Sequence, residues 1–203
     1  IVVSNPPYLG SGKMGDELKK FVKDNYLGSR DLYAAFIERC SAFAGEGDYV
    51  SMVTPENFMF LYSYRKLRSH IVQNQQFIEA AHLSRYGFDQ QKDAYTIPFV
   101  LRNNDPSGFE HSRFYRMTED QPEYAHYEDK IAGLEQIIQT HRRGEEHDDV
   151  YVVNQNSFKN IDRSPFIYWF GQEILQIFID HTQLGNIADV KQGLSTGNDD
   201  MFM

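Results

Sequence analysis

Ile-Val-Val-Ser-Asn-Pro-Pro-Tyr, residues 1–8, is the segment from which the predicted fold follows. Ile1–Ser4 is a short apolar run of the kind that forms a buried β-strand. Two prolines end the run, because proline has no amide hydrogen to donate to a ladder of hydrogen bonds. The sequence therefore predicts a strand over residues 1–4, with Asn5–Tyr8 turning away from its carboxyl end.

Beyond Tyr8 the pattern of apolar residues alternates between helical and strand periods. Apolar side chains recur at steps of three and four after Asp31, whereas shorter apolar runs are closed by proline, glycine or polar clusters. The expected elements are a loop with about one helical turn over residues 9–30, a helix over 31–43, a strand over 49–54, a helix over 57–72, and strands over 77–83 and 94–101. This order predicts an α/β fold with a mostly parallel sheet that ends in an antiparallel hairpin.

Two local features refine this prediction. Pro98 lies inside the last of these strands, so we expect that strand at an edge of the sheet or at a bulge. On the helix over residues 57–72, we expect Arg65, Lys66 and Arg68 to face solvent.

The character of the sequence changes after Asn103, where a turn cluster begins. The expected elements beyond it are a polar helix over 124–141, a short strand over 150–153 and an aromatic, apolar helix over 167–179. We therefore divide the chain into residues 1–104, a mostly helical linking region over 105–185, and a last segment over 186–203.

Composition places this chain among globular proteins. It has 203 residues, 41% of them apolar, and no run approaches 18 uninterrupted apolar residues, so neither a membrane span nor a signal peptide is expected. The single cysteine, Cys40, cannot form an internal disulfide and indicates a reducing cytoplasm. The net charge of −9 argues against a chain that wraps nucleic acid through its own charge. Because the chain begins and ends abruptly, we expect it to be a piece of a larger protein.

Asn5–Tyr8 is the strongest candidate for chemistry. Prolines hold the backbone rigid, and the Asn5 side-chain oxygen and the Pro6 carbonyl can both accept from an exocyclic amine. Tyr8 offers a flat face on which a planar ring can stack. The expected guest is a planar amide or the amine of a nucleobase, although a strand that simply ends in a proline turn is the alternative for so short a motif.

This motif resembles the catalytic motif of S-adenosylmethionine-dependent methyltransferases that act on amino groups, chiefly the DNA adenine-N6 enzymes. Residues 48–55 resemble the strand after the catalytic one, residues 88–96 the hairpin whose aromatic faces the flipped base, and residues 192–198 the segment that leads into a target-recognition domain. The likeness covers essentially the whole chain and is greatest to the PglX-type adenine methyltransferases of BREX phage-defence systems. It rests further on residues 9–11, 36–40, 64–68, 81–83, 99–103 and 168–169.

The resemblance implies a domain organisation. Residues 1–104 would be the C-terminal half of the Rossmann-like catalytic domain of a class I methyltransferase, residues 105–185 its linking region, and residues 186–203 the start of the target-recognition domain. The family's glycine-rich turn and ribose-binding carboxylate precede the motif. We therefore expect the 203 residues alone to be inactive.

The same resemblance implies the site and its partners. Asn5, Pro6, Pro7 and Tyr8 would be catalytic, Tyr8 and Phe88 would sandwich the extruded adenine, and Asn5 and Pro7 would contact the methyl donor. S-adenosylmethionine is the implied donor, and no metal is implied. Double-stranded DNA, bound through the recognition domain, and other defence-system proteins are the implied partners, in the bacterial cytoplasm and without a membrane.

Other interpretations of the same residues remain open. Protein glutamine-N5 methyltransferases carry the same motif, and a non-catalytic binding or scaffold module would keep the same fold. Gly10–Gly15 spells G-x-G-x-x-G, but two prolines and a tyrosine separate it from the strand, so a loop beside the substrate is expected rather than a dinucleotide-binding turn. The histidines show no metal-ligand spacing, Cys40 falls on the apolar face of its helix, and the aromatics of residues 166–170 are expected to pack within a helix.

Overall fold

The computed structural model describes residues 1–85, 87, 95–104, 111–118 and 120–189 of the chain. It divides into two compact units, residues 1–170 and residues 171–203, and each is described here by itself. None of the described helices is long and apolar enough to cross a membrane.

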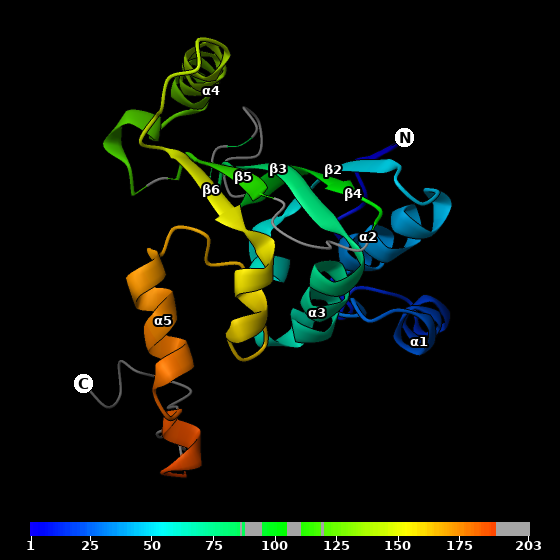
Figure 1. Ribbon diagram of the computed structural model, residues 1–203. Coiled ribbons are helices and arrows are strands. Elements are labelled where there is room, and N and C mark those ends of the chain that lie inside the picture. The colour runs from blue at the N-terminus through cyan, green and yellow to red at the C-terminus, as the bar shows by residue number, and fades with distance from the viewer. Residues whose placement is uncertain (86, 88–94, 105–110, 119, 190–203) are drawn as a thin grey trace, which may run out of the picture. The chain divides into compact units, whose positions relative to one another are not determined.

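A six-stranded sheet organises the first unit (Figure 1). Its strands lie in the order β1-β2-β4-β3-β5-β6. Their bounds are β1 Val2–Ser4, β2 Tyr49–Pro55, β3 Gln76–His82, β4 Thr96–Arg102, β5 His111–Arg116 and β6 Val150–Asn154. With the helices between them, these strands confirm the α/β class.

The sheet is mixed rather than mostly parallel in its pairing. The pairs β1–β2 and β3–β5 are parallel, and the pairs that involve β4 or β6 are antiparallel. Four strands thus share one direction, but β4 separates β2 from β3. The expected antiparallel hairpin is present, because β3 pairs with β4.

The expectation that Pro98 marks an edge strand or a bulge at that point is wrong in its first part, because β4 lies inside the sheet. The Thr96 amide donates to Ser84 on the β3 side, 2.9 Å away, and amides two residues apart in a strand point the same way. The missing amide hydrogen of Pro98 therefore faces β3. The pairing of β4 with β3 extends only as far as Phe99, the neighbour of Pro98, which pairs with Ala80. Pro98 itself has no partner in β3, so its missing amide hydrogen costs no hydrogen bond of the ladder.

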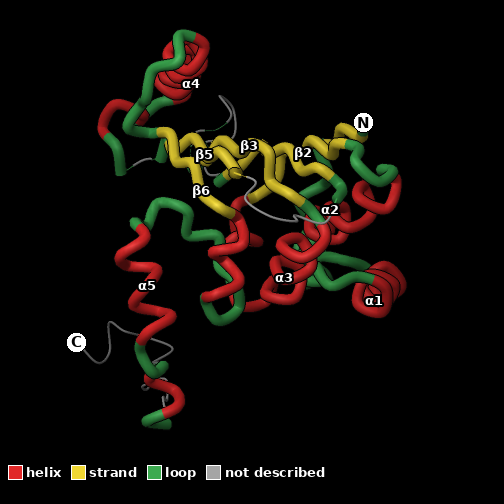
Figure 2. The backbone as a smooth tube through the Cα atoms, viewed as in Figure 1, coloured by secondary structure: helices red, strands yellow, loops and turns green. Residues whose placement is uncertain are grey.

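The helices come mainly from the segments between the strands (Figure 2). They are α1 Asp16–Asn25, α2 Leu32–Phe43, α3 Arg65–Asn74, α4 Tyr127–Arg142 and α5 Gln172–Asp180, with 3₁₀ turns η1 Glu56–Met59, η2 Tyr62–Tyr64, η3 Pro122–Tyr124, η4 Gln155–Asn160 and η5 Leu184–Asn186. Of these, α5 and η5 belong to the second unit. The single helical turn expected within residues 9–30 is instead the ten-residue helix α1, so that expectation is wrong in part. Acidic residues in the first turn of α1 and Lys23 in its last turn suit the helix dipole, and Val22 anchors it in the core.

In place of the helix expected over residues 57–72, the structure has two 3₁₀ turns followed by α3. The expected exposure of one arginine in this region is wrong. Arg68 does not face solvent: it is only 1% exposed. Its guanidinium donates to the carbonyls of Phe58 and Leu61, at 2.8 and 2.7 Å, and to that of Arg163 at 3.2 Å. Turns of this kind leave carbonyls without partners inside their own helix, and a buried guanidinium satisfies several of them at once.

Residues beyond 104 contribute to the same sheet. The strands β5 and β6 both come from the region expected to be mostly helical, and the first unit extends to Phe170. The predicted α4 and β6 are present, whereas β5 was not expected. The division of functional domains at 104 and 185 stays a prediction.

The helix expected over residues 167–179 begins only at Gln172. Tyr168, expected inside that helix, and Phe166, expected to pack with it, lie before Gly171 in an irregular segment and are buried in the core of the first unit. The Tyr168 ring stacks on that of Phe114, with centroids 4.3 Å apart and planes at 6°. The expected packing role is thus confirmed, but a bend in the chain, and not a helix, brings these rings to β5.

One face of the sheet carries the main core. Alternate residues of β2 and β4, among them Met52 and Phe99, are buried, and α2 and α3 pack on this face through Ile37 and Leu67 (Figure 2). Cys40, also in α2, is buried in the same cluster, as the sequence predicts. Because this layer holds the strands in place, it also sets the positions of the residues that follow their carboxyl ends.

Candidate active site

The candidate site lies where three strands end. Asn5–Tyr8 follows β1, Glu56 follows β2, and His82 is the last residue of β3. These three strands point in the same direction. The carboxyl ends of parallel strands are where ligands bind in open α/β sheets, so the topology gathers these groups at that edge.

Asn5 and Tyr8 lie together at this edge. The Tyr8 hydroxyl is 3.4 Å from the Asn5 Oδ1 atom and 3.2 Å from the Val53 carbonyl oxygen of β2. Pro6 is buried, whereas Asn5, Pro7 and Tyr8 are exposed. The hydroxyl has one hydrogen to share between two acceptors at long range, so the Asn5 oxygen keeps the capacity to accept from a guest amine.

The Tyr8 ring packs against a group of aromatic rings in the core. Its ring meets that of Tyr33 edge to face, with centroids 6.2 Å apart, and Tyr33 in turn lies 6.0 Å from Tyr64. Burial raises the pKa of the Tyr8 phenol above its usual value, so the hydroxyl stays a neutral donor through the physiological range. These rings keep the Tyr8 ring in one orientation while part of it stays accessible.

Asp31 fastens the segment after Tyr8 to the start of α2. Its carboxylate accepts from the amides of Leu9 and Tyr33, at 2.9 and 3.3 Å, the second contact being the N-cap of the helix. Burial raises the pKa of this carboxyl, although those amide contacts act in the opposite direction. Gly10 forms an isolated bridge with Asp31, so the Gly10–Gly15 segment closes a turn against α2.

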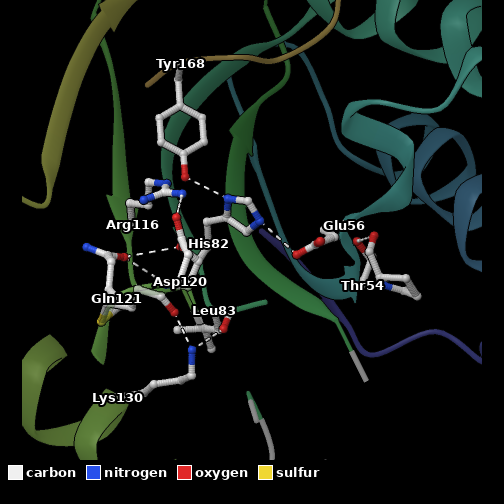
Figure 3. A network of polar contacts seen from close by, with 12 residues as sticks. Thr54, Glu56, His82, Leu83, Arg116, Asp120, Gln121, Lys130 and Tyr168 are labelled. Atoms are coloured by element: carbon white, nitrogen blue, oxygen red, sulfur yellow. Dashed lines mark hydrogen bonds and ion pairs between the residues drawn. The ribbon is translucent and has the colours of Figure 1, made fainter. Parts of the chain in front are cut away.

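A buried network at the same edge escaped the sequence-based prediction (Figure 3). The Nε2 atom of His82 lies 2.8 Å from a Glu56 carboxylate oxygen, and its Nδ1 atom lies 2.8 Å from the Tyr168 hydroxyl. A carboxylate only accepts, so Nε2–H donates to Glu56, and Nδ1 of the neutral ring accepts from Tyr168. One imidazole therefore joins the carboxyl ends of β2 and β3 to the irregular segment that precedes residue 171.

The sequence contains a signal for this network. Glu56 and His82 both stand at the ends of predicted strands, where the sheet topology brings such residues to one edge. The spacing of the histidines along the sequence, which tests for metal ligands, does not reveal a histidine that pairs with one carboxylate and one hydroxyl. Tyr168 carries no comparable signal, because its contact with His82 spans 86 positions of the chain.

Several contacts hold the two ends of the segment between β3 and β4, near Ser84 and Thr96. Ser84 adopts a φ of 52°, a strained value for a residue with a side chain, and pairs with Thr96. The buried Lys130 of α4 donates to the carbonyl of Leu83 at 2.5 Å and to that of Met117 (Figure 3). A Cβ atom on Gly87 would lie 2.1 Å from the Thr96 hydroxyl oxygen, so this close approach requires glycine.

The structure places four of the five predicted site residues together, and the fifth lies outside the described residues. Asn5, Pro6, Pro7 and Tyr8 share one turn at the carboxyl edge. Phe88, the predicted partner of Tyr8, lies outside the described residues. In the described ranges, no group of three or more histidine, cysteine, aspartate or glutamate residues is arranged to hold a metal ion.

Comparison with known proteins gives matches over the whole chain. Residues 1–88 match the family described as Eco57I restriction-modification methylase. The adenine-specific methyltransferase PglX of Lacticaseibacillus casei (strain Zhang) is 31% identical over 207 residues, and the adenine-specific methyltransferase BrxX of Escherichia coli O9:H4 (strain HS) is 32% identical over 206 residues. Each alignment covers 100% of this chain but only 16% of the relative, so the chain spans about one-sixth of the length of these proteins.

Solved structures show the same fold. A protein of a type I restriction-modification system aligns with a TM-score of 0.57 and 15% identity, over 92% of this chain and 40% of the other. At that identity the likeness concerns the fold alone, and it agrees with the α/β architecture described above.

Proposed function

We propose that this chain, which aligns over its whole length with the adenine-specific methyltransferases PglX and BrxX, forms the substrate-amine side of the active site of a DNA adenine-N6 methyltransferase. The observation that carries this proposal is the turn after β1 at the carboxyl edge of the sheet. There the exposed Asn5 and Tyr8 lie together, with the Tyr8 hydroxyl 3.4 Å from the Asn5 Oδ1 atom. A planar ring that bears an amine matches both side chains.

Two acceptors hold the amine in this proposal. The Asn5 Oδ1 atom and the Pro6 carbonyl accept from the two hydrogens of adenine N6, which makes its lone pair more available for transfer. Tyr8 stacks on the base, and Phe88 is assigned to its other face. Because the amine of a paired adenine is engaged in the duplex, the base must be rotated out before it reaches this turn.

S-adenosylmethionine supplies an activated methyl group when it is bound. The exposed positions of Asn5 and Pro7 fit contacts to this donor, and the neutral donor state of the Tyr8 hydroxyl keeps the edge free of a competing charge. The residues of this chain position the N6 amine for in-line transfer, and the amine then releases a proton to water. Positioning accounts for most of the acceleration, so no strong general base is required.

The full protein would act in phage defence or restriction-modification, in the cytoplasm, on double-stranded DNA and alongside other defence proteins. The names of the relatives support adenine methylation, and the description of the matched family supports restriction-modification. The remaining parts of this proposal extend the family resemblance. Methylation of a protein glutamine is the second candidate, because a side-chain amide offers the same NH₂ group. The match of the whole chain to adenine-specific enzymes favours DNA.

Methyl transfer in the full-length protein tests the proposal. With labelled S-adenosylmethionine and duplex DNA under single-turnover conditions, Asn5→Ala should slow the transfer step by about a hundredfold while largely sparing DNA binding, because it displaces the amine without removing the stacking face. Asn160→Ala, an exposed asparagine in η4, is the matched control and should transfer at the parental rate.

Three results would count against the assignment. Equal transfer rates in Asn5→Ala and the parent would remove Asn5 from the site. Label on a protein glutamine and none on DNA would favour the second candidate. Label on neither substrate in the parental protein would support a non-catalytic module.

A further inference from the structure

A cationic depression lies between the end of α1 and the start of α3. It has a volume of about 510 Å³, and its charged lining consists of Lys23, Arg30, Arg65 and Lys66, with Asp24 the one carboxylate among its described lining residues. The chain as a whole carries a net charge of −9. Four cations on one surface of an acidic chain are therefore a local concentration of charge. We call these four residues the cationic surface.

An exposed aromatic ring forms part of this surface. Tyr62 is 54% exposed, and the guanidinium of Arg65 lies 4.1 Å from its ring centroid. A second guanidinium, that of Arg163, lies 4.6 Å from the same ring. The ring thus holds two like charges near each other, an arrangement that an external anion would stabilise.

Among the described residues, ion pairs leave this surface largely positive, although the Asp24 carboxylate also lines it. In the part of the chain that the structure describes, no carboxylate lies within ion-pair distance of Arg30, Arg65 or Lys66; Arg163 pairs with Asp162 at 2.9 Å. Beneath it, Arg68 is bound to three carbonyl oxygens. Burial, and to a lesser extent the nearby charge of Arg65, lower the pKa of Arg68 to about 10.

The cationic surface is linked to the candidate active site by one backbone hydrogen bond and by a path of ring contacts. The Ser11 amide, three residues after Tyr8, donates to the Arg30 carbonyl at 2.8 Å. Along the other side, the ring contacts run from Tyr8 through Tyr33 to Tyr64, the residue before Arg65. Two ring-to-ring steps therefore separate the Tyr8 ring from the start of α3.

We propose that the cationic surface binds the sugar–phosphate backbone of the DNA strand next to the nucleotide whose base enters the turn at Asn5–Tyr8. This inference rests on the proposed function. Phosphates repeat along a strand, so several separated cations suit a nucleic acid backbone, and such contacts position the duplex without reading its sequence. The surface also explains how an acidic chain would meet DNA, because the charge is concentrated beside the site.

Salt dependence of DNA binding tests the proposal in the full-length protein. Each lost phosphate contact reduces the slope of log K against log salt by about 0.9, so Arg65→Ala/Lys66→Ala should flatten the slope by about 2 and weaken binding about tenfold at low salt. The effect should be equal for duplexes of different sequence. Arg65→Lys/Lys66→Arg should keep the parental slope.

Controls separate charge placement from total charge and from folding. Arg142→Ala/Lys159→Ala removes the same charge from exposed positions in α4 and η4 and should leave the slope unchanged. Thermal unfolding of the double variants should match the parent, since Arg65 and Lys66 lie outside the core.

A slope that is unchanged in Arg65→Ala/Lys66→Ala would overturn the proposal, as would an equal change in the control pair. Loss of polyglutamate binding with unchanged DNA binding would also overturn it, since the surface would then serve an acidic protein. The outcome is independent of catalysis: a parent that binds DNA with the predicted slope changes but never methylates it would remove the proposed function and keep the surface.

Discussion

At the scale of single residues, Tyr8 has two separable parts. Its hydroxyl lies near the Asn5 side chain and the Val53 carbonyl, whereas its ring rests edge-on against Tyr33 and is 37% exposed overall. The hydroxyl orients the turn, and the ring is the part assigned to the base. Substitutions that remove one part at a time therefore distinguish the two roles.

We expect Tyr8→Ala to weaken capture of the extruded adenine by ten- to a hundredfold, because base stacking on an aromatic ring contributes roughly 1–3 kcal/mol. Tyr8→Phe keeps the ring and should stay within about threefold of the parent, since both contacts of the hydroxyl are long. Binding of a duplex whose target adenine is mismatched, followed by single-turnover methylation, measures the effect. Equal losses in Tyr8→Phe and Tyr8→Ala would contradict the stacking assignment.

At the scale of elements, His82 connects three segments that are far apart in the chain. It lies at the end of β3, Glu56 opens η1 after β2, and Tyr168 belongs to the irregular segment before residue 171 (Figure 3). The rings of Phe60 and Trp169 flank the imidazole, with centroids 5.9 and 6.2 Å away. A polar bridge enclosed in this way holds the carboxyl edge of the sheet together.

His82→Phe should lower the free energy of unfolding by about 2–4 kcal/mol, because it leaves a buried carboxylate and a buried hydroxyl without their partner. Chemical denaturation of the variant and parent measures the difference. His141→Phe, at an exposed position of α4, is the matched control and should change the value by less than about 0.5 kcal/mol. A loss as small as that of the control would mean that water replaces the imidazole.

At the scale of the whole molecule, β1 lies at one end of the sheet order and pairs only with β2 among the described strands. Val3 is exposed there. The candidate amine-binding turn thus follows a strand with one free edge. The described residues include the turn that is proposed to hold the substrate amine. By the resemblance, the family's glycine-rich turn and ribose-binding carboxylate belong to a segment that precedes this turn.

The 203-residue chain by itself should therefore bind S-adenosylmethionine too weakly for micromolar affinity and should not methylate DNA. Titration calorimetry of the folded chain, with circular dichroism to verify the fold, tests this expectation. Micromolar binding would show that the donor site lies within residues 1–203, and a Gly10→Val variant would then test the turn after Tyr8.

Much of the site was predictable because its signal is local. Asn5–Tyr8 combines a strand end, two prolines, an amide and an aromatic ring within eight residues, and the structure places these groups on one turn. The contacts of His82 with Tyr168 and of Arg68 with Arg163, which the sequence did not reveal, join residues far apart in the chain. Arg68 was expected in solvent because its helical pattern says nothing of the carbonyls of Phe58 and Arg163 that surround it.

The sequence by itself determined the α/β class, the positions of most strands and the turn that follows β1, because hydrophobic period and proline act over a few residues. The chemistry assigned to that turn stays a prediction. Only the tertiary structure decided that β4 lies between β2 and β3, that β5 joins the sheet, and that His82 meets Tyr168. These features depend on which segments pair across long separations. Burial of the whole sheet face and the satisfaction of its buried polar groups select that pairing, and no short window of sequence contains either quantity.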